Sequence, residues 1–224
     1  MNLLQFTADT PEPDLRQAIV EVGQIAYHRG LLTANDGNIS VRLPNGNILI
    51  TPAGLCKGRL APEDLLIVSP DGHLLYPAAN PHLKPTSEQP MHLESLRQRP
   101  DIRAVLHAHP PYAVALSVAG YDLRDDFLPE VCMTLGQIPT TQFALPSSPE
   151  NAVAISQIIC HHNALLLRQH GSLTVGQDLE EALTHLERLE HVAKVQYMAQ
   201  TLGQITSLPE AILLTIRSPH ACVG

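Results

Sequence analysis

Two glycine-containing dipeptides, Asn45-Gly46 and Asp71-Gly72, each lie between short apolar runs in the first half of the chain. Such dipeptides favour the type I′ turn, whose twist matches that of two antiparallel strands. We therefore expect one hairpin over residues 38–51 and a second over residues 64–76. Two consecutive hairpins predict an antiparallel sheet and argue against an all-helical fold.

The second half of the chain alternates between helical and strand-like segments. Apolar runs at residues 102–106 and 164–167 predict buried strands, and residues 137–140 predict a short one. The spacing of apolar residues predicts helices over about residues 14–29, 88–97, 111–120, 150–159 and 179–202. We expect Asp14 to cap the first of these helices and Ser87 to cap the second.

This order of elements predicts the fold class α/β. We expect a single domain over residues 1–224, with a central mixed, largely antiparallel sheet between helical layers. Residues 1–13 are expected to form a flexible N-terminal arm, and residues 204–224 a C-terminal tail.

Charge and composition narrow the function classes. A net charge of −8 argues against nucleic acid or an anionic membrane as a partner. No apolar run approaches the ~20 residues needed to span a bilayer, and the N-terminus lacks the pattern of a signal peptide. Four scattered cysteines are expected to be reduced thiols. We therefore predict a cytoplasmic location.

Three histidines occur where apolar runs end. His107 and His109 are two residues apart after the run at 102–106, and in an extended chain this spacing places both on one face. His170 follows the run at 164–167 and is itself followed by Gly171. Three neutral imidazoles with an open fourth position are typical of catalytic zinc, and Glu88 could supply the acid or base beside it. A lone strand histidine is more often a core or surface residue.

These residues belong to five segments that resemble the class II aldolase/adducin superfamily in the family's own order, over roughly residues 14–203. The segments are Gly37-Asn38-Ile39-Ser40-Val41-Arg42, Thr51-Pro52-Ala53-Gly54, Pro85-Thr86-Ser87-Glu88, His107-Ala108-His109-Pro110 and His170-Gly171. Each segment is short, but five of them in order at matching spacing make a specific pattern.

The resemblance assigns roles to the residues in these segments. His107, His109 and His170 would be the ligands of one Zn²⁺ per subunit, with Mn²⁺, Co²⁺ or Fe²⁺ as alternatives. Glu88 would be the general acid/base and would also touch the metal when no substrate is bound. The phosphate of a sugar substrate would be bound by Gly37, Asn38, Thr51, Gly54, Thr86 and Ser87. Relatives form four-fold tetramers with sites at subunit boundaries, so a homotetramer is expected.

The function implied by the resemblance is a zinc-dependent aldolase of the L-fuculose-1-phosphate type. It would cleave a ketose 1-phosphate reversibly into dihydroxyacetone phosphate and an aldehyde, through an enediolate whose charge the metal stabilises. Three other reactions share that chemistry: dehydration of methylthioribulose 1-phosphate, 4-epimerisation of a pentulose phosphate, and decarboxylation of a phosphorylated keto acid. A non-catalytic adducin-like interaction module is the alternative outside enzymes.

One residue departs from the aldolase pattern. The family's fuculose phosphate aldolase carries, in a Pro-Tyr-Ala segment, a tyrosine that acts across a subunit boundary and transfers the proton at the oxygen of the departing aldehyde. The matching stretch here reads Gln142-Phe143-Ala144. Phenylalanine has no transferable proton, so either another group does this work or the reaction differs. Arg42 and Lys57 could add positive charge near a phosphate, although a solvated surface role is as consistent with their sequence context.

Overall fold

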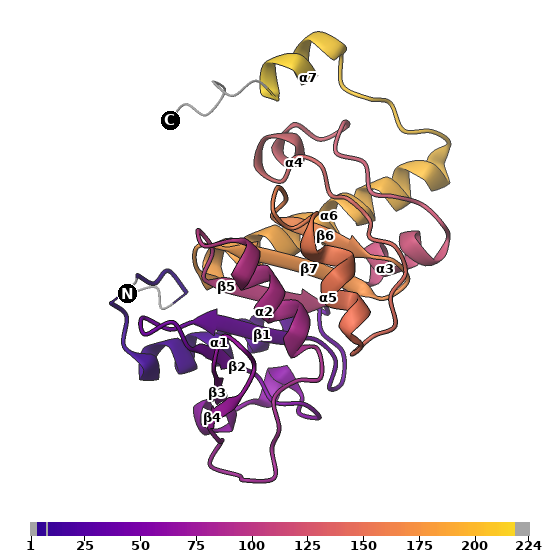
Figure 1. The fold of residues 1–224 in the computed structure, drawn as a ribbon. Helices are drawn as coiled ribbons and strands as arrows, with labels where there is room; N and C mark the ends of the chain where they lie inside the picture. The colour runs from indigo at the N-terminus through magenta and orange to yellow at the C-terminus, as the bar shows by residue number, and fades with distance from the viewer. Residues whose placement is uncertain (1–3, 8, 218–224) are drawn as a thin grey trace.

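The computed structural model describes residues 4–7 and 9–217, which form one seven-stranded sheet with helices on both faces (Figure 1). The strand order is β4-β3-β2-β1-β5-β7-β6, and every neighbouring pair is antiparallel. The strands are β1 (Asn38–Arg42), β2 (Ile48–Ile50), β3 (Leu66–Val68), β4 (Leu74–Tyr76), β5 (Ala104–Ala108), β6 (Ala164–Leu167) and β7 (Gly171–Gly176).

Both predicted hairpins are confirmed. β1 pairs with β2 around Asn45-Gly46, and β3 pairs with β4 around Asp71-Gly72. The two turn glycines have φ of +85° and +89°, which residues with a side chain rarely adopt. The hairpins are joined through the pairing of β2 with β3, so the first half of the chain forms a four-stranded meander.

The five predicted helices are present, with bounds that differ by a few residues. The helices are α1 (Glu12–His28), α2 (Gln89–Gln98), α3 (Pro111–Val118), α4 (Pro129–Thr134), α5 (Pro149–Ser156), α6 (Leu179–Leu202) and α7 (Glu210–Ile216), and two 3₁₀ turns are η1 (Lys57–Arg59) and η2 (Pro62–Asp64). The predicted caps were wrong: Asp14 lies inside α1, and Ser87 precedes Glu88, which holds the N-cap position of α2.

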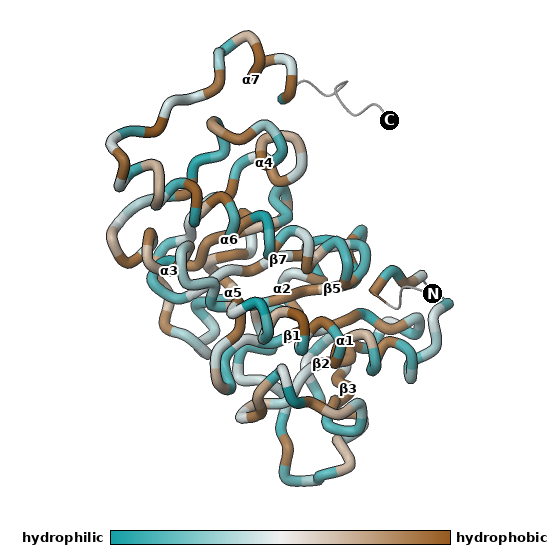
Figure 2. Tube along the Cα trace, turned by 180° about the vertical axis from the view of Figure 1, so that it is seen from behind, coloured by the Kyte–Doolittle hydropathy of each residue, from teal (hydrophilic) through white to brown (hydrophobic). Residues whose placement is uncertain are grey.

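Helices cover the sheet on both faces, as the sequence predicted. α1 and the first half of α6 cover the face that presents Ile39 and Leu106, whereas α2 and α5 cover the face that presents Ile50 and Val105. Figure 2 shows hydrophobic stretches along the strands in the middle of the molecule. None of the helices in the described residues combines the length and apolar character needed to cross a lipid bilayer.

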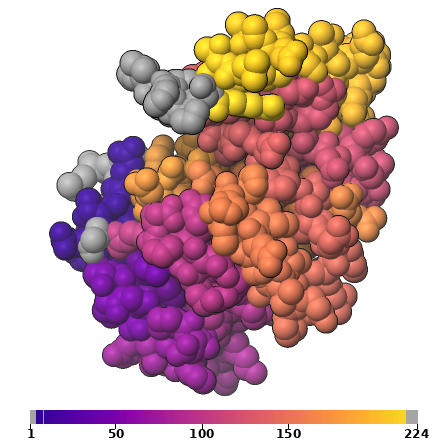
Figure 3. All heavy atoms as spheres, turned by 45° about the horizontal axis from the view of Figure 1, so that its top comes forward, coloured from indigo at the N-terminus to yellow at the C-terminus, as the bar shows by residue number. Residues whose placement is uncertain are grey.

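Several segments differ from the sequence-based expectation, among them α4, which lies in a stretch for which no helix was predicted. β7 was not predicted, although it lies in the sheet between β5 and β6. The short strand expected at residues 137–140 is an isolated bridge between Thr140 and Leu166, the one parallel pairing in the described part of the chain. Within the predicted tail lies α7, which packs at one end of the molecule against α4 (Figure 3).

The N-terminal segment contacts the core. Leu4 and Phe6 are buried in the same cluster as the apolar face of α1, and the Arg103 guanidinium lies 5.0 Å from the centre of the Phe6 ring. These contacts contribute apolar burial in a part of the chain that the sequence predicted to be a flexible arm.

Candidate active site

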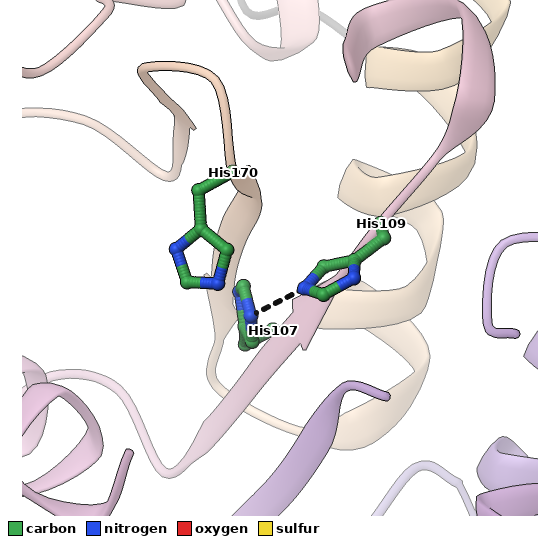
Figure 4. A group of neighbouring side chains, drawn as sticks. All are labelled: His107, His109 and His170. Carbon is green, nitrogen blue, oxygen red and sulfur yellow. Dashed lines mark hydrogen bonds between the residues drawn. The ribbon is translucent and has the colours of Figure 1, made fainter. Parts of the chain in front are cut away.

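Three imidazole rings converge at the end of the sheet (Figure 4). His107 lies in β5, His109 follows that strand directly, and His170 lies in the turn between β6 and β7. One ring nitrogen from each lies within 4.8 Å of the other two, and this is the one such group of metal-ligating side chains in the described residues. The Nε2 atoms of His107 and His109 are 3.0 Å apart. The sequence therefore identified the three histidines that the fold brings together.

The pairing of β5 with β7 positions this cluster. In their antiparallel register His107 lies opposite Leu173, and Ala108 lies opposite Ser172. The Nδ1 of His107 is 2.9 Å from the Ser172 carbonyl oxygen. A carbonyl only accepts, so Nδ1 carries a hydrogen, and when the ring is neutral its Nε2 has the lone pair that a metal would bind.

Gly171 allows the turn to approach the histidines closely. A Cβ at this position would lie 2.4 Å from the Ala108 carbonyl oxygen, 2.7 Å from the His109 ring and 3.0 Å from the His107 ring. These distances are shorter than van der Waals contact, so a side chain here has to displace the strand or the rings.

A Gly171→Ala variant is therefore expected to lose both stability and metal affinity. The strain should lower the free energy of unfolding by about 1–3 kcal/mol and weaken zinc binding at least about tenfold, measured by competition with a chelator. Gly176→Ala is the matched control, because a Cβ there would be 2.6 Å from the Ala182 nitrogen, at the other end of β7. Equal zinc affinity in the two variants would contradict this account of Gly171.

Glu88 lies beside the histidines, as the sequence predicted. Its Oε2 is 3.0 Å from His107 Nε2, and its Oε1 is 3.3 Å from His170 Nε2. The Nδ2 of Asn38 donates a hydrogen bond of 3.0 Å to Oε2. Burial raises the pKa of Glu88, but the contacts with His107 and Asn38 outweigh it and hold the pKa below its ordinary value. Glu88 is therefore a carboxylate at neutral pH.

The donor set fits a metal ion. Burial, followed by the proximity of His107, lowers the pKa of His170 to about 4 and also lowers that of His109. Both rings are thus neutral at physiological pH, which is the form that binds a metal. Among the described residues, Oε1 of Glu88 is a buried atom without a hydrogen-bond partner. The structure thus provides converging nitrogen donors and an unpaired carboxylate oxygen at one point.

A cleft of about 220 Å³ opens beside the histidines. Five of the six residues predicted to bind phosphate line it: Gly37, Asn38, Gly54, Thr86 and Ser87. The sixth, Thr51, does not line the cleft. Its side chain is fully buried, and its hydroxyl accepts a hydrogen bond of 3.1 Å from the Ile39 amide. Thr51 therefore joins β1 to the end of β2.

Two hydroxyls of the cleft lie at the start of α2. Thr86 Oγ1 accepts a hydrogen bond of 3.3 Å from the Glu88 amide, and Ser87 Oγ is 2.7 Å from Ser147 Oγ. The first amides of a helix stabilise an anion. This end of the cleft is therefore suited to a phosphate group.

Lys57 also lines the cleft, and the sequence left its role open. Its side chain is buried, with 2% of the residue exposed, and its ammonium donates to the carbonyl oxygens of Asn35 and Leu55 at 2.6 and 2.7 Å. Burial lowers the pKa of Lys57 to about 8. Arg42, the other candidate cation, donates instead to the Leu96 and Arg99 carbonyls near the end of α2.

His92 is a second residue whose place the sequence did not predict. It is fully buried in α2, four residues after Glu88, and its ring contacts both Asn38 and Ser40 of β1. Spacing of four residues places two side chains on one helix face, and this was the available signal.

Comparison with known proteins gives one consistent group. A family model described as "Class II Aldolase and Adducin N-terminal domain" matches residues 17–197. The 3-oxo-tetronate 4-phosphate decarboxylase of Escherichia coli K12 is 34% identical over 191 residues, covering 84% of this chain and 88% of the relative. The L-fuculose phosphate aldolase of Methanococcus maripaludis is 33% identical over 184 residues, covering 82% and 96%.

A solved structure is similar to this chain over most of its length. The crystal structure of YgbL from Escherichia coli, described as an aldolase, epimerase or decarboxylase, superposes with a TM-score of 0.85 at 32% identity. The superposition covers 92% of this chain and 99% of the YgbL chain. Similarity therefore extends over nearly all of the described fold, including the elements that carry the three histidines.

Proposed function

The chain belongs to the class II aldolase and adducin family, and on that basis we propose that it is a zinc-dependent lyase that decarboxylates a phosphorylated 3-oxo sugar acid. The aldolase reaction predicted from the sequence is the second candidate. The observation that separates the two is Phe143, which stands where the aldolase pattern has a tyrosine and whose side chain is 58% exposed.

The two reactions share an intermediate and a product. In 3-oxo-tetronate 4-phosphate, breaking the bond between C1 and C2 releases CO₂ and leaves the electron pair in an enediolate of C2 and C3. Adding one proton to C2 then gives dihydroxyacetone phosphate. An aldolase reaches the same enediolate by breaking the C3–C4 bond of a ketose 1-phosphate. A zinc ion bound by His107, His109 and His170 would act as a Lewis acid that stabilises the negative charge.

The leaving groups make different demands on the protein. When an aldehyde leaves, the C4 hydroxyl must lose its proton, and in the reverse direction the aldehyde oxygen must gain one. A CO₂ molecule leaves without any proton transfer to or from its oxygens. Phe143 cannot transfer a proton, so this position supports decarboxylation over aldol cleavage.

Glu88 would act at the carbon that gains the proton. Its Oε1 is buried and has no hydrogen-bond partner, while Asn38 holds Oε2. Substrate entering the cleft would separate the carboxylate from the histidines, which removes the contacts that lower its pKa and lets it carry a proton. Glu88 would deliver that proton to C2 and regain one from solvent, so the cycle consumes one proton.

The phosphate would bind at the start of α2, with Thr86, Ser87, Gly37 and Gly54 around it. Lys57 would supply the positive charge, because its ammonium has a third hydrogen left and forms no ion pair with a carboxylate in the described residues. Burial of this ammonium is costly, and it lowers the pKa of Lys57 to about 8 although Asp36 and Glu88 lie near enough to favour the charge. A phosphate in the cleft would offset that cost.

Replacing Lys57 by methionine is expected to raise KM for the phosphorylated substrate by about 10- to 100-fold, because a charged hydrogen bond contributes about 1.5–3 kcal/mol, while kcat changes little. The dissociation constant of inorganic phosphate, measured by calorimetry on zinc-loaded protein, should rise in parallel. Arg59→Met is the control, since Arg59 is exposed in the same 3₁₀ turn and does not line the cleft. Unchanged phosphate affinity in Lys57→Met would exclude this role.

The reaction is tested with a panel of substrates and zinc-loaded protein. We expect 3-oxo-tetronate 4-phosphate to yield equal amounts of CO₂ and dihydroxyacetone phosphate. Dihydroxyacetone phosphate released from fuculose, rhamnulose or ribulose 1-phosphate, with no CO₂ from the keto acid, would establish the aldolase instead. Methylthioribulose 1-phosphate tests the dehydratase. No reaction and no stoichiometric metal would favour the adducin-like module.

Three further assignments accompany this proposal. Zinc is the proposed ion, because three imidazoles with an open position are its usual catalytic set. A homotetramer is proposed, and the exposed apolar residues Met133, Phe143 and Leu145 are consistent with subunit contacts; sedimentation as a monomer would contradict it. The cytoplasmic location expected from the sequence stays a prediction.

A further inference from the structure

A row of buried polar side chains runs from the sheet through α2 to Glu88. Ser40 Oγ is 2.7 Å from His92 Nδ1, and His92 Nε2 is 2.5 Å from Asn38 Oδ1. Asn38 Nδ2 then donates to Glu88 Oε2 at 3.0 Å. Ser40 and His92 are fully buried, and 3% of Asn38 is exposed. Such groups are rarely buried unless each is satisfied, and here each is satisfied by the next.

The strand register explains how the row is assembled. Asn38 and Ser40 are two residues apart in β1, so both face the α2 side of the sheet. Asn38 lies opposite His107 in the pairing of β1 with β5. His92 lies one turn after Glu88 in α2 and fills the space between the two β1 residues. The row therefore joins the metal-binding strand, its neighbour and the helix that begins at Glu88.

The chemistry of the atoms fixes the direction of each hydrogen bond. Asn38 Oδ1 can only accept, so His92 Nε2 carries the hydrogen. In the neutral ring Nδ1 then accepts from the Ser40 hydroxyl. Burial, then the proximity of His107, lowers the pKa of His92 to about 3, so the ring is neutral at working pH. With Oδ1 held by His92, only the NH₂ group of Asn38 can face Glu88.

We propose that Ser40 and His92 are positioning residues that hold the Asn38 amide in the orientation that donates to Glu88. If the hydrogen bond from His92 is lost, the Asn38 amide can turn by 180° and present Oδ1 to Glu88. The Glu88 carboxylate and Oδ1 would then repel each other. Glu88 would then leave the geometry in which Oε1 is free for the substrate. This role rests on the proposed function of Glu88 as acid/base, and it assigns no contact with substrate or metal to His92 or Ser40.

The kinetic test compares variants of the row with a control from the same helix. Ser40→Ala and His92→Phe are expected to lower kcat at least about tenfold while KM changes less than about threefold and zinc content stays stoichiometric. His92→Gln can still donate to Asn38 and should recover much of kcat. The control is Ser95→Ala, because Ser95 is also fully buried in α2 but donates to the Met91 carbonyl at 2.8 Å.

The outcomes separate positioning from general stability. If kcat falls in Ser95→Ala as much as in Ser40→Ala at equal loss of melting temperature, or if His92→Gln is no better than His92→Phe, the proposal is overturned. A second readout needs no substrate: ¹⁵N NMR of histidine-labelled wild-type protein should show His92 protonated at Nε2 only, without titration between about pH 5 and 8. The opposite tautomer, or a protonated ring, would also overturn it. This readout stands even if the proposed decarboxylation fails.

Discussion

The His170→Ala variant is expected to lose stoichiometric zinc and at least about 1,000-fold in kcat, because charge stabilisation by a metal contributes several kcal/mol to the transition state. The remaining two histidines leave the ion with too few protein ligands for a stable site. His170 comes from the turn between β6 and β7, whereas His107 lies in β5 and His109 directly after it, so removal of His170 leaves β5 and its pairing with β1 intact.

This prediction is checked by metal analysis and by recovery from chelation. Wild-type protein dialysed against a chelator should lose activity and regain it with added zinc, and His170→Ala should not regain it. His161→Ala is the control, since His161 is exposed in the loop before β6 and is not one of the three clustered histidines. Full zinc content in His170→Ala would show that the metal is bound elsewhere.

The second large effect is expected for Glu88→Gln, a change that keeps the size and shape of the side chain. Loss of a general acid/base typically costs about 10²- to 10⁴-fold in rate, and we expect kcat to fall within that range. The glutamine carbonyl can still accept from Asn38, so the fold and the three histidines should be unaffected. Zinc content should therefore stay equal to that of the wild type.

Deuterium labelling makes this test specific to proton delivery. In D₂O the wild-type enzyme should place one deuteron stereospecifically on the new CH₂ group of dihydroxyacetone phosphate. In Glu88→Gln the slow residual reaction should lose this stereospecificity, because the proton then comes from water. Turnover near the wild-type rate, or retained stereospecificity, would assign the proton transfer to another group.

The sequence predicted those parts of the site that depend on local pattern. His107 and His109 could be placed because an apolar run and a spacing of two fix their shared direction on a strand. The turns at Gly46 and Gly72 could be placed because few residues adopt their positive φ. In each case a short stretch of sequence determines the geometry.

The parts that the sequence did not predict depend on contacts between distant segments. β7 begins and ends with glycine and alternates Ser172 and Thr174 with apolar residues, so it lacks the continuous apolar run of β5 and β6. Its place in the sheet follows from pairing on both sides. Thr51 is predicted to bind phosphate; it does not line the cleft, and its hydroxyl accepts a hydrogen bond from the Ile39 amide of the neighbouring strand.

His92 and Lys57 show the same limit for polar side chains. For His92 the one sequence signal was its spacing of four residues from Glu88, which indicates a shared helix face but does not name the partners of the ring. His92 is buried because β1 presents Asn38 and Ser40 to it across the sheet surface. Lys57 is buried because the backbone carbonyls of Asn35 and Leu55 accept its hydrogens. The partners of His92 and one of the two partners of Lys57, Asn35, lie far from them in the sequence.

The position of β7 between β5 and β6 has a consequence for how the protein folds. The hydrogen bond from His107 to the Ser172 carbonyl spans 65 residues of chain, and His170 joins the cluster only when β7 has paired with β5. Such long-range pairing forms late, because closing the intervening loop costs entropy before any contact is gained. A nascent chain that ends before β7 would therefore contain all three histidines but hold only His107 and His109 in place, and metal capture would follow completion of the sheet.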